Sequence, residues 1–262
     1  MITDVHTHAF PDKLAARAMQ ILLEECDKVT AYRDGTVGSL LESMQQAGIE
    51  RSVICSIATR PEQWRPILDW SLTIRSNRIL PLGSVHPQDE FAVKHLQNVA
   101  DAGLPGIKLH PYYQDFVLDD PAYSSFFSAM EDLGLVLISH CGYDVAFPED
   151  DRAAPFRIIN LLKKHPRLKM VTTHLGAWND WQSVREHLLG RPVWMEVSYS
   201  LEILPADEAR EMLLSHPPEY LLFGTDSPWQ DQSAALKLLR SLELPQEIES
   251  AMLHSNPLRL FP

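Results

Sequence analysis

The chain has 262 residues, of which 45% are hydrophobic, and its 23 basic and 35 acidic side chains give a formal net charge of −12. This composition excludes an intrinsically disordered or fibrous protein. The sequence contains neither a basic run that could follow a phosphate backbone nor an apolar stretch of 18 residues. We therefore expect no nucleic acid and no membrane among its partners.

Cysteines are sparse in this sequence. Cys26, Cys55 and Cys141 are too few and too widely spaced for a disulfide framework. The chain begins Met-Ile-Thr-Asp, without the basic segment and apolar stretch of an export signal. We therefore expect a protein of a reducing compartment, the cytoplasm.

Short apolar segments rich in Val, Ile and Leu alternate with longer segments of helical periodicity. Several are apolar at nearly every position, as strands covered on both faces should be. Eight strand and helix units predict an α/β fold, a parallel sheet closed into a (β/α)8 TIM barrel, which commonly takes about 250 residues. The eight apolar segments begin near Ile2, Ser52, Ile79, Gly106, Leu135, Leu168, Val193 and Tyr220.

The connection over residues 9–35 is longer than the others. Its part 11–28 has the pattern of an extra amphipathic helix inserted after the first strand. No Ser/Gly-rich linker, low-complexity tract or internal repeat divides the sequence. We predict a single domain over residues 1–262, with an active site walled in part by this helical insertion.

Histidines gather at the predicted strand ends. The carboxyl ends of all strands meet at one rim of a barrel, so residues distant in sequence converge there. His6 and His8 lie two apart on a strand, so both side chains leave the same face and can reach one ion. The six histidines at or just beyond strand ends are His6, His8, His86, His110, His140 and His174.

Three further ligand-type residues strengthen this pattern. His140 ends the fifth predicted strand, His174 the sixth and Asp226 the eighth. An isolated H-x-H motif predicts little, but five such residues at one rim indicate a metal centre, and neutral imidazoles suit a borderline ion such as zinc.

Seven segments resemble those of a known family. They are DVHTHAFPD at 4–12, DGTVGSLLESMQQAGIERSV at 34–53, GIKLHP at 106–111, ISHCG at 138–142, THLG at 173–176, FGTDSPW at 223–229 and NPLRLF at 256–261. Their order and spacing are specific, and the resemblance extends over nearly the whole chain. The sequence is thus similar to the amidohydrolase superfamily of metal-dependent hydrolases. Within it, the sequence resembles the amidohydrolase-2 branch, which includes aminocarboxymuconate-semialdehyde decarboxylase-like proteins.

The resemblance implies roles for individual residues. A metal ion would be held by His6, His8, His140 and Asp226, with a water or hydroxide completing its coordination. Asp226 would exchange a proton with that water as general base, and His174 would orient or polarise the substrate. These roles agree with the ability of a divalent ion to lower the pKa of a bound water to about 7.

Lys108 and His110 lie two apart on the fourth predicted strand and should face the same way. Lys108 has three interpretations: a carbamylated bridge between two ions, as in two-metal members of the superfamily, a contact with a substrate carboxylate, or an ion-pair partner of a rim acid. We favour the substrate contact, because a buried lysine needs a partner and the branch resembled often uses anionic substrates. His110 either binds the same substrate or braces the rim.

Neighbouring residues receive structural interpretations first. We expect Asp4 to support the ligands by a hydrogen bond and Cys141 to fill the core. Glu196 and Ser198 end the seventh strand, where substrate contact is one option. We expect about half of the aromatic residues after rim positions to anchor loops and the others to line a pocket: Tyr112, Tyr113, Tyr143, Trp178, Trp181 and Trp229.

The leading hypothesis is a hydrolase with one metal ion that acts on a small carboxylate-bearing ester, lactone or amide. The alternative is a decarboxylase or hydratase of an unsaturated or aromatic acid, because the same ligands serve both reactions. A dinuclear phosphoesterase or nuclease is disfavoured, because this sequence has no clear counterpart of the carboxylate that bridges the two ions in such enzymes, and because the chain is acidic. A hypothesis from another functional class is a protein that binds a metal or a small ligand without catalysing a reaction.

The expected cofactor is one divalent ion. Zinc fits three imidazoles and a carboxylate best, and manganese, iron or cobalt would also fit. The expected partner is a small anionic substrate. A homodimer is open to this chain, because the apolar helices at 18–25 and 233–242 could form a patch, although packing on the barrel is the simpler interpretation.

Overall fold

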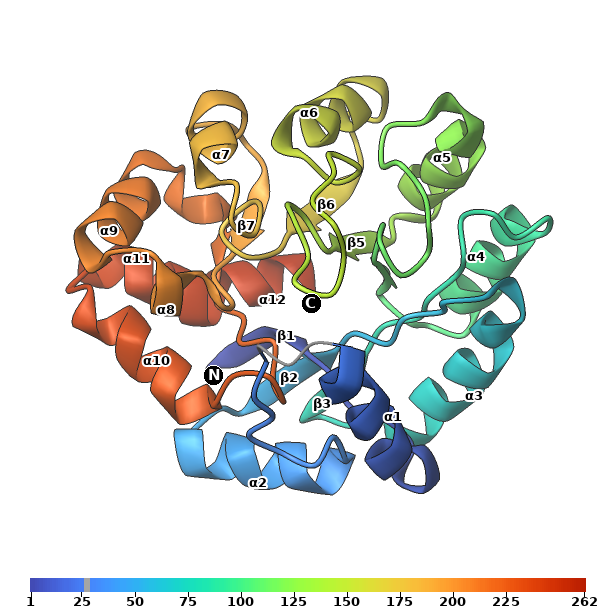
Figure 1. Cartoon of the computed structure of the whole chain (residues 1–262), viewed down its shortest axis with the longest axis horizontal. Coiled ribbons are helices and arrows are strands. Elements are labelled where there is room, and N and C mark those ends of the chain that lie inside the picture. The colour runs from blue at the N-terminus through green and yellow to red at the C-terminus, as the bar shows by residue number, and fades with distance from the viewer. Residues whose placement is uncertain (26–28) are drawn as a thin grey trace.

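The computed structural model describes residues 1–25 and 29–262, so Cys26 lies outside the described residues. It contains the eight predicted parallel strands and confirms the TIM barrel (Figure 1). The strands are β1 (Thr3–Thr7), β2 (Arg51–Ile54), β3 (Ile79–Pro81), β4 (Gly106–Leu109), β5 (Val136–Ser139), β6 (Lys169–Thr172), β7 (Trp194–Glu196) and β8 (Leu221–Leu222).

The strands form two sheets, β1-β2-β3 and β4-β5-β6-β7-β8, which are joined into a barrel by backbone contacts. Gly83, just after β3, pairs with Ile107 of β4, and Thr7 of β1 pairs with Ser227 beyond β8. The N–H of Val5 also donates to the carbonyl of Phe223 at 2.9 Å. The barrel is thereby closed between its first and last strands.

Helices surround the strands, as strand and helix alternation predicts (Figure 1). Left-handed glycines end two of them, Gly48 at φ 72° and Gly134 at φ 68°. The helices are α1 (Asp12–Glu25), α2 (Val37–Ala47), α3 (Trp64–Ile74), α4 (Ala92–Asp101), α5 (Ser124–Leu133), α6 (Pro155–Lys164), α7 (Trp181–His187), α8 (Ser200–Ile203), α9 (Ala206–Ser215), α10 (Gln232–Ser241), α11 (Gln246–Ser250) and α12 (Asn256–Leu260). Among the described residues, no helix is long and apolar enough to cross a membrane.

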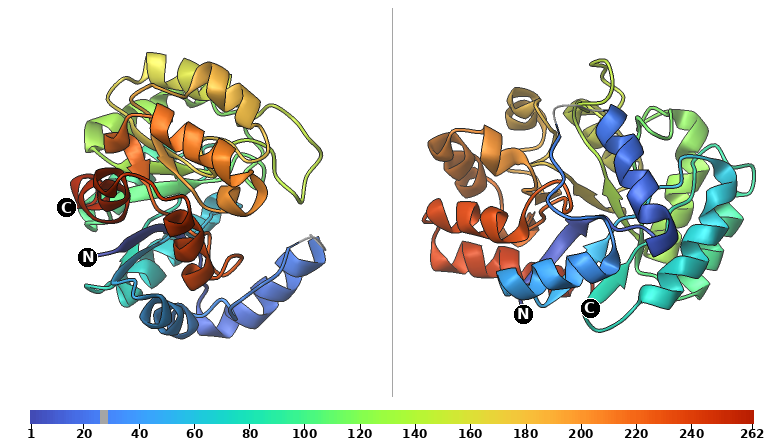
Figure 2. Two further views of the ribbon diagram at one scale, coloured as in Figure 1. Left: turned by 90° about the vertical axis from the view of Figure 1, so that its left-hand side faces the viewer. Right: turned by 60° about the horizontal axis from the view of Figure 1, so that its bottom comes forward.

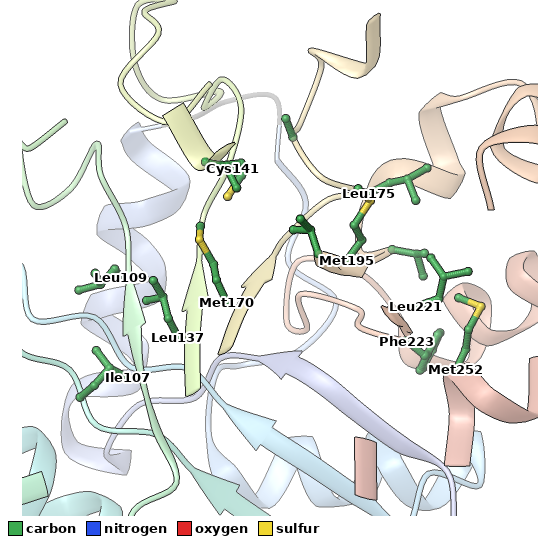
Figure 3. Close-up of a cluster of buried hydrophobic side chains, with 14 of the residues drawn as sticks. Ile107, Leu109, Leu137, Cys141, Met170, Leu175, Met195, Leu221, Phe223 and Met252 are labelled. Atoms are coloured by element: carbon green, nitrogen blue, oxygen red, sulfur yellow. The ribbon is translucent and has the colours of Figure 1, made fainter. Parts of the chain in front are cut away.

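Alternating strand residues divide the core into two layers. Leu137 of β5 packs in the layer between strands and helices, whereas Val136 and Ile138 belong to the cluster inside the barrel. Figure 3 shows the outer layer, with Leu109, Met170, Met195 and other side chains from β4 to β8. Since Ile107 and Leu109 pack outward, the pleat directs Lys108 between them toward the barrel interior.

An irregularity in β1 helps to place the site. Asp4 pairs with Ser52 and Thr7 with Ile54, so β1 has one residue more than β2 over this stretch. Such a bulge changes which side chains face inward. Val5 packs with the interior cluster, and the next residue, His6, still reaches across the barrel to the site described below.

The predicted helical insertion is α1. Its Ala15 and Met19 are buried against the rest of the molecule. The insertion is tied at its base, where the N–H of Phe10 donates to the carbonyl of Gly35 at 2.8 Å. Gly35 has φ +78°, and a Cβ there would meet the Met19 side chain at 2.8 Å, so this turn requires glycine. In Figure 1, α1 lies inside the ring of helices, next to α3.

Candidate functional site

A cavity of about 690 Å³ lies at the carboxyl ends of the strands. The left view of Figure 2 shows α1 and the yellow-green segment after β5 projecting on this side of the barrel, opposite both termini. Leu14 and Ile21 of α1 contribute to the lining, so the insertion walls the cavity as predicted. All six side chains that the sequence assigns to metal, catalysis or substrate at strands 1, 4, 5 and 6, and Asp226 after β8, also line it: His6, His8, Lys108, His110, His140, His174 and Asp226.

Three of these residues form what we call the first cluster: His6, His8 and Asp226. The Nε2 atoms of His6 and His8 lie 3.2 Å apart. Asp226 Oδ1 lies 3.3 Å from His6 Nε2 and 2.9 Å from His8 Nε2. The first cluster therefore presents two imidazole nitrogens and a carboxylate oxygen at one point.

Backbone hydrogen bonds hold the first cluster together. The N–H of Asp226 donates to the carbonyl of His6 at 2.7 Å, and the N–H of His8 donates to the carbonyl of Ser227. Asp226 has φ +60°, a conformation that non-glycine residues seldom adopt. The chain thus turns sharply after β8 and places the Asp226 carboxylate beside both histidines of β1.

Lys108 is 1% exposed, and its ammonium donates to His6 Nε2 at 2.9 Å. His6 Nε2 accordingly carries a lone pair that faces a positive group. Burial, and secondarily the charge of Lys108, lowers the pKa of His6 well below its ordinary range. His6 is therefore neutral at pH 7, the state in which imidazole binds metals.

Glu196 lies behind the first cluster and is fully buried. Its Oε1 accepts from His6 Nδ1 at 3.1 Å and from the N–H of His174 at 3.0 Å. Its Oε2 accepts from the N–H of Ser198 at 2.7 Å. Because the Nδ1 proton of His6 points to Glu196, the Nε2 lone pair points to the cavity. Gly224 makes room for this carboxylate, since a Cβ there would overlap Glu196 Oε2.

Sequence reasoning left the role of Glu196 open. The signal that could have found it is a carboxylate at an inward-facing position next to a strand end, opposite histidines of another strand. Burial raises the pKa of Glu196, and the hydrogen bonds from Ser198 and from the N–H of His174 partly oppose this rise.

Asp4 supports the site from below, as the sequence predicts. Its Oδ1 accepts the N–H groups of His6 at 3.2 Å and of Thr225 at 3.1 Å. Gln232 of α10 donates to its Oδ2 at 2.7 Å. Burial raises the pKa of Asp4 to about 7. Asp4 therefore ties β1 to the turn that carries Asp226.

A second cluster consists of His110, His140 and Asp144, whose potential ligand atoms also lie close together. Asp144 Oδ2 lies 3.3 Å from His110 Nε2 and 3.7 Å from His140 Nε2. The two imidazole rings are stacked, with centroids 4.2 Å apart and planes inclined by 14°. Burial opposes ionisation of Asp144, but hydrogen bonding and charge from His110 outweigh it and lower the pKa of Asp144.

His140 and His174 connect the two clusters. His140 Nε2 donates to the carbonyl of Tyr143 at 2.8 Å, and its Nδ1 lies 3.2 Å from His174 Nε2. His174 Nδ1 lies 3.0 Å from Ser198 Oγ. Burial lowers the pKa of His140 to about 3 and that of His174 to about 4, so both are neutral at pH 7.

The structure thus brings together three of the four predicted metal ligands and places His140 in the second cluster. That His140 also binds the ion stays a prediction, as do the substrate contacts of Lys108 and His110. Asp144 escaped sequence analysis because it lies in a loop, four residues after His140, where no strand periodicity marks it.

The aromatic residues divide as expected between pocket and anchor. Tyr113, Trp178 and Trp229 line the cavity. Tyr112 donates to the carbonyls of Gly142 and Asp150, and Trp181 Nε1 donates to the carbonyl of His174. Cys141 is buried in the outer core layer, as predicted (Figure 3).

The donor set of the first cluster fits a divalent ion. Two imidazole nitrogens and one carboxylate oxygen converge, and the lone pair of His6 Nε2 already accepts from the Lys108 ammonium. His6, His8 and Asp226 would hold such an ion.

These features define a metal-dependent amidohydrolase barrel. The chain belongs to the amidohydrolase family, whose sequence pattern matches residues 3–262. This confirms the family named in the sequence analysis. No curated protein matches the chain significantly.

Solved structures share the fold. An uncharacterised TIM-barrel protein of Bordetella bronchiseptica is 20% identical, with a TM-score of 0.80 over 99% of this chain and 97% of that one. The 5-carboxyvanillate decarboxylase of Sphingomonas paucimobilis is 18% identical, with a TM-score of 0.75 over 99% and 98% of the two chains. A 5-carboxyvanillate decarboxylase of Novosphingobium aromaticivorans, complexed with manganese and 4-hydroxy-3-methoxy-5-nitrobenzoic acid, is 12% identical, with a TM-score of 0.73 over 100% and 96%.

Proposed function

We propose that this protein is a metal-dependent decarboxylase of a small aromatic carboxylic acid. The observation that carries the proposal is the position of Lys108, a buried cation at the first cluster. Lys108 and the first cluster line the end of the cavity at the strand ends, which we call the floor, and Trp178 and Trp229 also line this cavity. A carboxylate would bind at this floor and an aromatic ring would contact the indoles. Two of the similar structures are named as decarboxylases, which supports this reaction over the hydrolase hypothesis.

The reaction replaces the carboxylate by a proton. The bond between the ring carbon and the carboxyl carbon breaks, CO2 leaves, and the electron pair stays on the ring carbon and takes a proton. We assign delivery of that proton to Asp226, which would take it from water and pass it to the ring carbon, and the remaining hydroxide would add to CO2 to give bicarbonate. We assign orientation of the acid to His174, because both side chains line the cavity. A divalent ion, when bound, supplies positive charge that holds the acid and stabilises negative charge during the reaction. Manganese in a relative makes it as reasonable a first choice as zinc.

The test is to load the protein with Mn²⁺ or Zn²⁺ and to offer 5-carboxyvanillate, 2,6-dihydroxybenzoate and their methyl esters. We expect bicarbonate from at least one acid and no methanol from any ester. Release of methanol without bicarbonate would contradict the proposal and support the hydrolase hypothesis instead. Asp226→Asn should abolish turnover, on the order of 1,000-fold or more, since it removes both a ligand and the proton carrier.

Lys108 provides a second test. Lys108→Met should raise KM for the acid strongly, and Lys108→Arg should restore part of the binding because it keeps the positive charge. An unchanged KM in Lys108→Met would show that the carboxylate binds elsewhere.

A further inference from the structure

One face of α1 presents apolar side chains to the cavity. Leu14, Ala18, Ile21 and Leu22 all line it. Their spacing of i, i+4, i+7 and i+8 places them on one side of the helix. Leu14 is 57% exposed and Ile21 is 40% exposed, so packing of the described residues leaves much of this face uncovered.

A second group of apolar residues lines the same cavity. Ile57 follows β2, and Pro66, Ile67 and Trp70 come from one face of α3. Figure 1 shows α1 and α3 next to each other at this side of the barrel. We call these eight residues the α1–α3 wall: Leu14, Ala18, Ile21, Leu22, Ile57, Pro66, Ile67 and Trp70.

The α1–α3 wall is longer than one aromatic ring. From Leu14 to Leu22 the helix rises by eight steps of 1.5 Å, or about 12 Å. A cavity of about 690 Å³ lies in the range that holds drug-sized molecules. Apart from Glu25 at the end of α1, the charged and histidine side chains of the lining lie at or shortly after the strand ends, whereas the eight residues of the wall are all apolar. The wall therefore favours an uncharged part of a ligand.

We propose that the α1–α3 wall is a subsite for an apolar tail of the substrate. The ligand would be an aromatic acid that carries an alkyl or aryl extension several carbons long. Its placement rests on the proposed function, which puts the carboxylate on the floor of the same cavity. The continuity of the wall with that floor is what favours a substrate tail over a partner protein as its occupant.

The experiment measures the binding of 4-alkylbenzoates to the Mn²⁺-loaded protein by calorimetry, with benzoate, 4-ethylbenzoate and 4-butylbenzoate as probes. Each buried methylene should tighten binding about fourfold, which gives on the order of 100-fold from benzoate to 4-butylbenzoate. In the variant Leu14→Ser/Ile21→Ser this ratio should fall to about tenfold.

The matched control is Leu72→Ser/Val93→Ser. These two apolar residues are 39% and 47% exposed and lie outside the lining of this cavity. The control should keep the 100-fold ratio. An equal ratio in both double variants would overturn the subsite. A shift of the Leu14→Ser/Ile21→Ser variant from dimer to monomer in gel filtration, with no change in the ratio, would instead assign the wall to contact between copies.

Benzyl alcohol and 4-butylbenzyl alcohol separate this inference from the proposed function. The same gain from the butyl group in the alcohols would support the subsite even if no acid were decarboxylated. Binding and turnover of ring-sized acids without any gain from the butyl group would overturn the subsite alone. Absence of binding by every probe would overturn both.

Discussion

The first and second clusters contain the same side chains, two histidines and one aspartate, at the same rim of the barrel. They differ in where their protons and lone pairs point. In the first cluster, Glu196 accepts the Nδ1 proton of His6, so the lone pair of Nε2 points to the cavity, where it faces Lys108 and Asp226. In the second, His140 Nε2 donates to the carbonyl of Tyr143, so this nitrogen offers a proton.

Ring geometry separates the two clusters further. The rings of His110 and His140 are nearly parallel at 4.2 Å, and lone pairs in the planes of stacked rings do not converge on one point. His6 and His8 are inclined by 66°, with their Nε2 atoms 3.2 Å apart. Equal composition therefore does not make equal metal sites, because a ligand needs a directed lone pair and a partner that fixes the ring.

Removing both histidines of the first cluster should have the largest effect. We expect His6→Ala/His8→Ala to weaken Mn²⁺ binding on the order of 1,000-fold, since one carboxylate is left as ligand. His110→Ala should change the affinity less than about threefold, because His110 belongs to the second cluster, whose stacked rings do not direct their lone pairs at one point. Competition with a chelating dye measures both constants, and plasma mass spectrometry gives the ion content. A comparable loss in His110→Ala would contradict the distinction between the clusters.

His140 decides how separate the clusters are. If it turns toward the ion, as the family resemblance implies, His140→Ala should weaken Mn²⁺ binding about 100-fold. His110→Ala is the appropriate control, because it removes the ring that stacks on His140 and leaves His140 in place. An affinity like that of the wild type would confine His140 to the second cluster.

The sequence was sufficient for the framework of the site. Strands buried on both faces are apolar throughout, and parallel closure brings their ends together, so the positions of His6, Lys108 and Asp226 at one rim followed from counting strands. The helix α1 was also recognisable from its periodicity, because Ala15 and Met19 are buried on one side.

Orientation was not accessible in the same way. The extra residue in β1 between Asp4 and Thr7 has no sequence marker, although it determines which side chains face inward. The stacking of His110 on His140 and the loop position of Asp144 depend on side-chain packing across the rim. Glu196 was visible only as a residue at a strand end, because its partners lie on β1 and beyond β6.

Glu196→Gln sharpens the comparison at the point where the clusters differ most. Both carboxylate oxygens accept hydrogen bonds, so an amide places a donor against a donor in either orientation. We expect the affinity for Mn²⁺ to fall about tenfold, which is the lower end of the loss seen when a residue that hydrogen-bonds to a metal ligand is replaced.

The control for this substitution is Glu131→Gln. Glu131 is 8% exposed on its side chain and likewise accepts from a histidine ring, His165 Nδ1 at 3.4 Å, and from a backbone N–H, that of Arg167. Glu131→Gln should lower Tm without changing the affinity for Mn²⁺. If both variants lose Tm and neither loses affinity, Glu196 serves stability alone.

Asp144→Asn should have the smallest effect on the ion. Because the second cluster presents a donor at His140 Nε2, we expect one Mn²⁺ per chain in both proteins and an affinity within about threefold. Burial lowers the pKa of His110, and the charge of Asp144 partly opposes this, so the substitution should lower that pKa further. In an NMR titration of the metal-free protein, His110 should therefore stay neutral to a lower pH than in the wild type. Two ions per wild-type chain and one in Asp144→Asn would instead make the second cluster a metal site, and would show that its stacked rings separate when the ion binds.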